Sequence, residues 1–125
     1  MRDLIVLIAI FSGVFIASFY TEKYLIDSGN SIVEKLTVIK DEVEEDSMES
    51  MDELVKIKEE WDTIEDIWNM FLNHQITDNI ELSFTRLLIS YGEDEKAECL
   101  VNIAEIVGLI EDAPRTEKIA LANLF

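Results

Sequence analysis

Residues 51–71, MDELVKIKEEWDTIEDIWNMF, contain the pattern that decides the fold. Large apolar side chains recur there at helical spacing, and acidic side chains are frequent between them. The segment therefore predicts an amphipathic helix, preceded by Ser47 or Ser50, with one face in a core. Trp61 and Trp68 are seven residues apart, which favours a core position over a ligand cage. The apolar positions are Met51, Leu54, Trp61, Ile64, Trp68 and Phe71.

A helix is also predicted just before this segment. Gly29 and Asn30 interrupt the chain, and Ser31 is a candidate N-cap for a helix that follows them. Its apolar residues alternate in steps of four and three, at Ile32, Leu36, Ile39 and Val43. The two helices form a predicted αα-hairpin over about residues 31–73.

A second hairpin is predicted over about residues 77–113. Its first helix begins near Asp78 and stops at Gly92, and its second begins at Asp94. Pro114 is expected to end that helix, because proline lacks the N–H that a helix interior needs. Residues 116–125 form an apolar tail that is expected to add a short C-terminal helix.

The two hairpins resemble each other when the chain is shifted by 46 residues. Segments 49–66 and 95–112 then share eight of 18 residues, although composition alone can make such helices similar. The pairs outside these segments are Leu36/Leu82, Lys40/Arg86 and Val43/Ile89. A superhelix of tetratricopeptide-like units needs at least three repeats, so the prediction is an all-α, four-helix bundle made of a duplicated hairpin.

Residues 4–21, LIVLIAIFSGVFIASFYT, predict a membrane anchor that extends over residues 1–24. The run has no charged side chain, and as a helix it is about 27 Å long, close to the roughly 30 Å of a hydrocarbon core. Residues 25–125 then form the acidic bundle. The alternatives are a cleaved signal peptide, for which no A-x-A site follows the run, and a buried core helix.

The flanks of this run predict its orientation. Only three residues precede it, which favours a single-pass signal anchor in the cell membrane with a cytoplasmic N-terminus and an extracytoplasmic bundle. Ala9, Gly13 and Ala17 recur every fourth residue on one face. Small residues at that spacing let two helices approach closely in lipid, so this face is a candidate homodimer contact.

Charge and composition exclude several classes of protein. The formal net charge is −17, and a surface so acidic repels nucleic acid and favours a protein partner with a basic surface. Four glycines and one proline are too few for a small all-β domain. Cys99 is the single cysteine, so no intramolecular disulfide can form.

The joint between the hairpins, residues 73–86, is the candidate site. Its polar side chains predict a structural clasp in which Asp78 caps a helix and Arg86 pairs with Glu81 or Asp78. The alternative is a cleft beside the two tryptophans that binds a peptide end or a small polar ligand. The residues concerned are His74, Asp78, Asn79, Glu81 and Arg86, with Trp61 and Trp68.

No catalytic, cofactor or metal motif is recognisable, so no enzyme, cofactor or metal is predicted. The chain has one histidine, and nothing in the sequence brings His74 to Cys99. The acidic runs 41–46 and 93–95 lack the ligand spacing of a calcium-binding loop. A non-enzymatic, membrane-anchored interaction or structural module is the expected function, and ligand sensing by residues 73–86 is the alternative.

The chain resembles a family of short, uncharacterised proteins from spore-forming Gram-positive bacteria, which have one N-terminal span and a helical domain of unknown function. The apolar N-terminal run, Glu60-Trp61, the stretch HQITDNIELS at residues 74–83 and Arg86-Leu87 carry the resemblance. It covers almost the whole chain and implies no activity.

Overall fold

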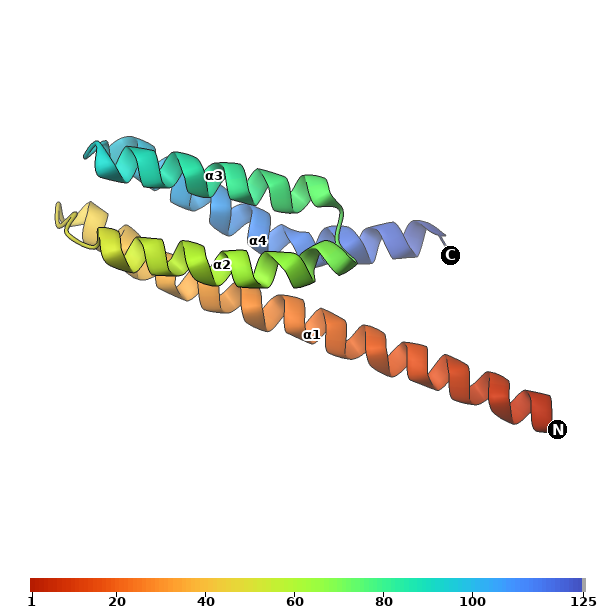
Figure 1. The fold of residues 1–125 in the computed structure, drawn as a ribbon. Coiled ribbons are helices and arrows are strands. Elements are labelled where there is room, and N and C mark those ends of the chain that lie inside the picture. Colours follow the sequence, from red (N-terminus) through yellow and green to blue (C-terminus); the bar gives the residue numbers. More distant parts are fainter. Residues whose placement is uncertain (125) are drawn as a thin grey trace.

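The structure is a computed structural model that describes the backbone of residues 1–124 and the side chains of residues 1–114. Helices account for nearly all of the described chain, which contains no strand, so the all-α prediction is confirmed (Figure 1). The helices are α1 (Arg2–Glu44), α2 (Met51–Phe71), α3 (His74–Gly92) and α4 (Lys96–Leu124).

The four helices form a closed antiparallel bundle. α1 packs against α2 and α4, and α3 packs against the same two helices, whereas within the described chain neither diagonal pair is in contact. In an open array of tetratricopeptide-like units the last helix would not return to the first. The contact between α1 and α4 therefore makes this molecule a bundle.

Aromatic rings fill the middle of the core. Trp61 and Trp68 are fully buried and pack edge to face, with ring centroids 5.3 Å apart. Trp61 also stacks on Phe84 of α3 at 6.2 Å. Branched aliphatic side chains from all four helices surround these rings. The prediction that both tryptophans are core residues is confirmed.

α1 is one continuous helix, so the prediction of a break at Gly29-Asn30 is wrong. Gly29 is buried where α1 meets its neighbours, and a Cβ at this position would lie 2.8 Å from Ile110 Cγ2. The glycine therefore permits a close helix contact. Ser31 does not cap a helix, because its hydroxyl donates a hydrogen bond to Glu60 of α2 at 3.0 Å.

Two other predicted helix boundaries differ from the structure. α3 begins four residues before Asp78, because Asn73 is its N-cap and accepts a hydrogen bond from the Gln75 N–H at 2.9 Å. α4 begins at Lys96 and continues past Pro114 to Leu124, so no separate C-terminal helix starts at residue 116. Proline removes one helical hydrogen bond but does not by itself stop a helix. Phe125 lies outside the described residues.

The two hairpins are related by a different offset from the one that the sequence suggests. An offset of 46 residues pairs buried Leu36 and Val43 with Leu82 and Ile89, which are 48% and 57% exposed. An offset of 48 residues pairs buried positions throughout the bundled part of α1 and α3: Ile32/Ile80, Leu36/Phe84, Ile39/Leu87 and Val43/Tyr91.

The turns explain why the offset changes between the first and second helices. Asp46 and Asp94, also 48 residues apart, both have a left-handed backbone, with φ of 58° and 54°. The α1–α2 connection comprises residues 45–50 and the α3–α4 connection only residues 93–95. The second helices therefore correspond at an offset of 45, which pairs buried Leu54/Cys99, Trp61/Ile106 and Trp68/Ala113.

The two ends of the bundle differ. The α1–α2 and α3–α4 connections lie at one end, here called the distal end (Figure 1). The α2–α3 turn lies at the opposite, proximal end, where the first part of α1 and the last part of α4 both extend beyond the turn. Leu25 is the first buried residue of α1, and the projecting part is long and apolar enough to cross a membrane.

Candidate functional site

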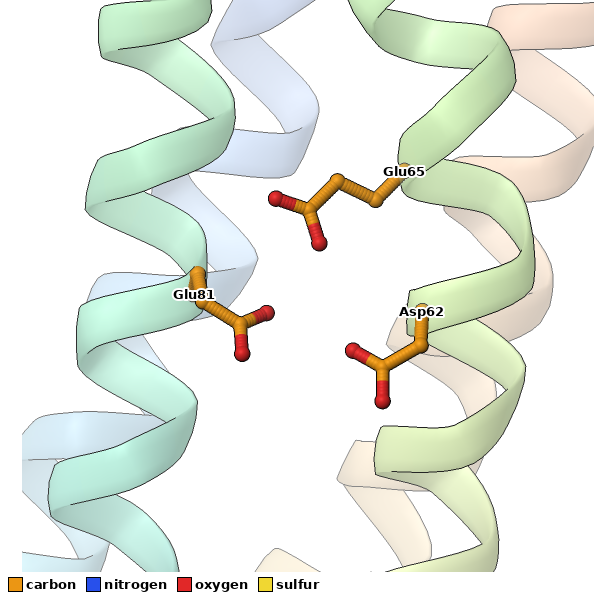
Figure 2. A group of neighbouring side chains, drawn as sticks. All are labelled: Asp62, Glu65 and Glu81. Carbon is orange, nitrogen blue, oxygen red and sulfur yellow. The ribbon is translucent and has the colours of Figure 1, made fainter.

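A polar cluster lies between α2 and α3, beside the buried tryptophans. Asp62 and Glu65 of α2 face Glu81 of α3, and oxygen atoms of the three carboxylates lie within 4.8 Å of one another (Figure 2). Lys58 precedes Asp62 by one helical turn and completes the cluster. Residues 58, 62 and 65 share one stripe of α2 because side chains three or four positions apart are neighbours on a helix. We call these four residues the carboxylate cluster.

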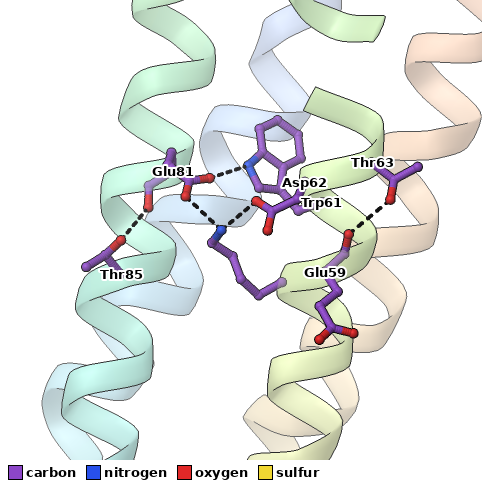
Figure 3. A network of polar contacts seen from close by, with 7 residues as sticks. Glu59, Trp61, Asp62, Thr63, Glu81 and Thr85 are labelled. Carbon is purple, nitrogen blue, oxygen red and sulfur yellow. Dashed lines mark hydrogen bonds and ion pairs between the residues drawn. The ribbon is translucent and has the colours of Figure 1, made fainter. Parts of the chain in front are cut away.

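Lys58 and Trp61 hold the cluster together. The Lys58 ammonium contacts Asp62 at 2.5 Å and Glu81 at 2.7 Å, and its side chain is only 15% exposed. The Trp61 indole N–H donates a hydrogen bond to the other carboxylate oxygen of Glu81 at 3.1 Å (Figure 3). Glu81 therefore connects α3 to both the charged surface and the aromatic core of α2.

The cluster favours a bound proton on Glu65. Burial and the negative charge of Glu81 raise the pKa of Glu65 to about 7, so near neutral pH this carboxyl is partly protonated. Burial would lower the pKa of Lys58, but hydrogen bonds to Asp62 and Glu81 outweigh it and raise that pKa. The Lys58 ammonium already neutralises carboxylate charge in the cluster, and a divalent cation would have to compete with it.

Only part of the predicted site is assembled. Glu81 and Trp61 meet, whereas Trp68 turns toward α1 and donates a hydrogen bond to Ser28 at 3.0 Å. The side chains of the other four predicted residues are exposed, and no hydrogen bond or ion pair joins them to one another in the described structure. They are His74, Asp78, Asn79 and Arg86.

The α2–α3 joint is held by residues other than the predicted pairs. Thr77 is fully buried, and its hydroxyl contacts the side chain of Asn69 and the carbonyl of His74. Glu81 pairs with Lys58, so the expected pairing of Arg86 with Glu81 or Asp78 is not formed among the described residues. Lys58, Asp62 and Glu65 were not among the predicted site residues, although their spacing beside Trp61 was the available signal.

A smaller polar group lies inside the α3–α4 interface. Ser90 accepts a hydrogen bond from Asn102 at 3.3 Å and lies 3.5 Å from the Cys99 sulfur. Burial raises the pKa of the Cys99 thiol, which disfavours the reactive thiolate. His74 is at the opposite end of α3 from Ser90, so the structure does not bring it to Cys99.

A groove of about 290 Å³ separates α1 from α2 near the distal end. Val38 and Ile57 contribute apolar surface, and charged side chains from both helices form its rim. On that rim Lys35 pairs with Glu60, and this hydrogen bond lowers the pKa of Glu60. Lys56 pairs with Glu53 on the same rim at 3.8 Å, so both lysines that line the groove are already paired, and it is less organised than the carboxylate cluster.

The candidate dimer face of the anchor is exposed. Ala9, Gly13 and Ala17 all lie on the projecting part of α1, and a Cβ at Gly13 would meet no atom within 4 Å. The homodimer contact remains a prediction.

Comparison with known proteins gives a family match. A family model described as a domain of unknown function, DUF4363, aligns with residues 19–124. No curated protein and no solved structure matches the chain.

Proposed function

The chain belongs to the DUF4363 family, for which no function is defined, and we propose that it is a non-enzymatic, membrane-anchored interaction module. In this proposal α1 crosses the cell membrane once with a cytoplasmic N-terminus. The acidic bundle stands outside the cytoplasm and presents its distal end to a protein with a basic surface.

The observation that carries the proposal is the continuity of α1. The exposed apolar segment and the buried core face belong to one 43-residue helix. No flexible linker intervenes, so the orientation of the anchor sets the orientation of the bundle, and the distal end points away from the bilayer. Residues 4–21 of α1 are apolar on every face, and a helix of this kind is unfavourable in water. This supports insertion of the segment into lipid.

The charge distribution supports the choice of partner. Residues 41–53 and 93–98, at the distal end, hold 12 of the 27 acidic residues and one basic residue, Lys96. Like charges gathered at one end create a local negative potential that attracts a basic surface and raises the rate of association. The orientation places that potential where a soluble or neighbouring membrane protein can reach it.

Charge reversal at the distal end tests this proposal. Glu45, Glu49 and Glu93 are exposed and make no side-chain ion pair in the described structure, so their replacement by lysine leaves the core unchanged. Crosslinking in intact membranes should yield a specific product with the native chain and lose it with this triple variant.

A matched triple variant controls for net charge. Glu34, Glu59 and Glu105 are also exposed but lie on the sides of the bundle, and lysine at these positions changes the charge by the same amount. This variant should keep the crosslinked product. Equal loss in both variants, or no product enriched over a chain with a scrambled bundle, would reject the distal end as an interaction surface.

Ligand sensing by residues 73–86 is the weaker alternative. Of the seven predicted site residues, which include Trp61 and Trp68, four are exposed and do not contact one another in the described structure. The predicted residues therefore do not form a cleft. A ligand that binds there would raise the melting midpoint of the native chain and not that of Arg86→Ala.

A further inference from the structure

We propose that the last turn of α2, with Met70 and Phe71 at its surface, rests on the headgroup layer of the bilayer. We call these two residues the proximal patch. The inference rests on the membrane anchoring proposed above and adds a second contact, in which the bundle itself touches lipid.

The proximal patch is apolar surface that the fold leaves uncovered. Met70 is 75% exposed and Phe71 is 40% exposed, whereas the next residue, Leu72, is buried in the core. Exposed side chains of this size at the end of a helix cost free energy in water, and burial against an apolar surface recovers part of it.

The chain around the patch has no formal charge. Residues 67–77 contain no Asp, Glu, Lys or Arg, although 30% of the whole chain is charged. Only residues 4–21, the apolar anchor segment, form a longer uncharged run. Both uncharged runs lie at the proximal end of the molecule (Figure 1), and the exposed polar side chains of Asn73, His74 and Gln75 at the α2–α3 turn can form hydrogen bonds with lipid headgroups.

The helix geometry brings the patch to the right depth. Trp68 lies level with Gly29, because its ring is 3.4 Å from the position of a Gly29 Cβ. Gly29 follows the end of the apolar segment, Thr21, by eight residues, which is about 12 Å along a helix.

Because α2 runs antiparallel to α1, Met70 and Phe71 are closer to the membrane than Trp68. Their backbone lies roughly 8 Å beyond the end of the span, by the helical rise per residue. The headgroup layer on each side of a bilayer is roughly 5–8 Å thick. Exposed side chains at this end are therefore within reach of that layer.

Electrostatics favours the same arrangement. The acidic residues at the distal end are repelled by anionic lipids, whereas the α2–α3 turn at the proximal end has no formal charge and is not. Tyr24 of α1, which is 36% exposed, lies between the span and the bundle, where tyrosine side chains favour the membrane interface. A lipid surface thus fits the composition, the exposure and the position of the proximal patch.

Depth-dependent fluorescence quenching tests the contact. The full chain is reconstituted alone in phosphatidylcholine vesicles that carry nitroxide lipids, with an environment-sensitive fluorophore on one introduced cysteine. The three single variants are Phe15→Cys in the anchor, Met70→Cys in the proximal patch and Glu93→Cys at the distal end. The parent chain is the labelling blank, because its Cys99 is buried.

Strong quenching is expected at residues 15 and 70, several-fold above that at residue 93. If residue 15 is quenched but residue 70 is quenched no more than residue 93, this inference is overturned. The proposed membrane anchoring would still stand. The same result is expected if the proximal patch binds a partner protein and not lipid, because the vesicles contain no protein other than this chain. Absence of quenching at residue 15 overturns the anchoring itself.

Discussion

Gly29 shows how one residue can have a role opposite to its usual one. Glycine followed by asparagine is typical of a turn, and a glycine inside a helix costs about 1 kcal/mol relative to alanine. Here it lies within a continuous helix, against Ile110 and Trp68. The close approach of α4 to α1 compensates for that cost, and only the packed structure reveals it.

Gly29→Ala is expected to destabilise the protein by about 1–3 kcal/mol, because overpacking outweighs the gain in helix propensity. The added Cβ would lie 2.8 Å from a branched methyl group of Ile110, with the Trp68 ring also within 3.4 Å. Thermal unfolding followed by circular dichroism measures the change. Asn30→Ala is the matched control, since Asn30 is exposed and its replacement should leave the midpoint equal or slightly higher. An unchanged midpoint for Gly29→Ala contradicts the close contact.

At the scale of the elements, the contribution of the α2–α3 contact to stability is expected to depend on pH. The pKa of Glu65 is about 7 in the folded protein and near 4.5 in the unfolded chain. Between these two pH values the folded state therefore binds more protons, so stability falls as pH rises from about 4.5 to about 7 and is independent of this group above that.

Glu65→Gln is expected to remove most of this loss, because the amide stays neutral at every pH. The variant should melt a few degrees above the native chain at pH 8, and the difference should shrink toward pH 5. Melting midpoints across this range test it. Glu59→Gln, on the exposed face of α2, changes the same charge outside the cluster and should show no such pH-dependent difference. Parallel curves for all three proteins would rule out proton binding at Glu65.

At the scale of the whole molecule, the bundle and the projecting part of α1 are separable in stability. No residue before Leu25 is buried, and the family match begins at residue 19. The first 20 residues therefore contribute no packing to the core, because all of them are exposed.

Deletion of residues 2–21 should leave a water-soluble, cooperatively folding helical domain. Its melting midpoint is expected to stay within about 2–3 °C of that of the full chain in detergent, because no core contact is removed. Size-exclusion chromatography and circular dichroism measure both properties. Loss of the cooperative transition would mean that the projecting helix stabilises the bundle.

The sequence by itself determined the helical class, the number of helices in the bundle, the buried tryptophans and the apolar N-terminal segment. All of these follow from the spacing of apolar residues, which is a local property of the chain. Of the two predicted starts of α2, Ser47 and Ser50, the structure has Ser50 as the N-cap. The correct predictions are therefore those that depend on residues close together in the sequence.

The tertiary structure alone decided the continuity of α1, the offset between the hairpins and the carboxylate cluster. The continuity of α1 and the carboxylate cluster depend on residues far apart in the sequence, since Gly29 packs against Ile110 and Glu65 lies beside Glu81. Local signals at Gly29, Asp78 and Pro114 favoured helix ends. Packing between helices keeps α1 continuous through Gly29, Asn73 caps α3 before Asp78, and α4 continues through Pro114. The antiparallel packing also brings the acidic segments 41–53 and 93–98 together at the distal end and leaves the uncharged α2–α3 turn at the proximal end.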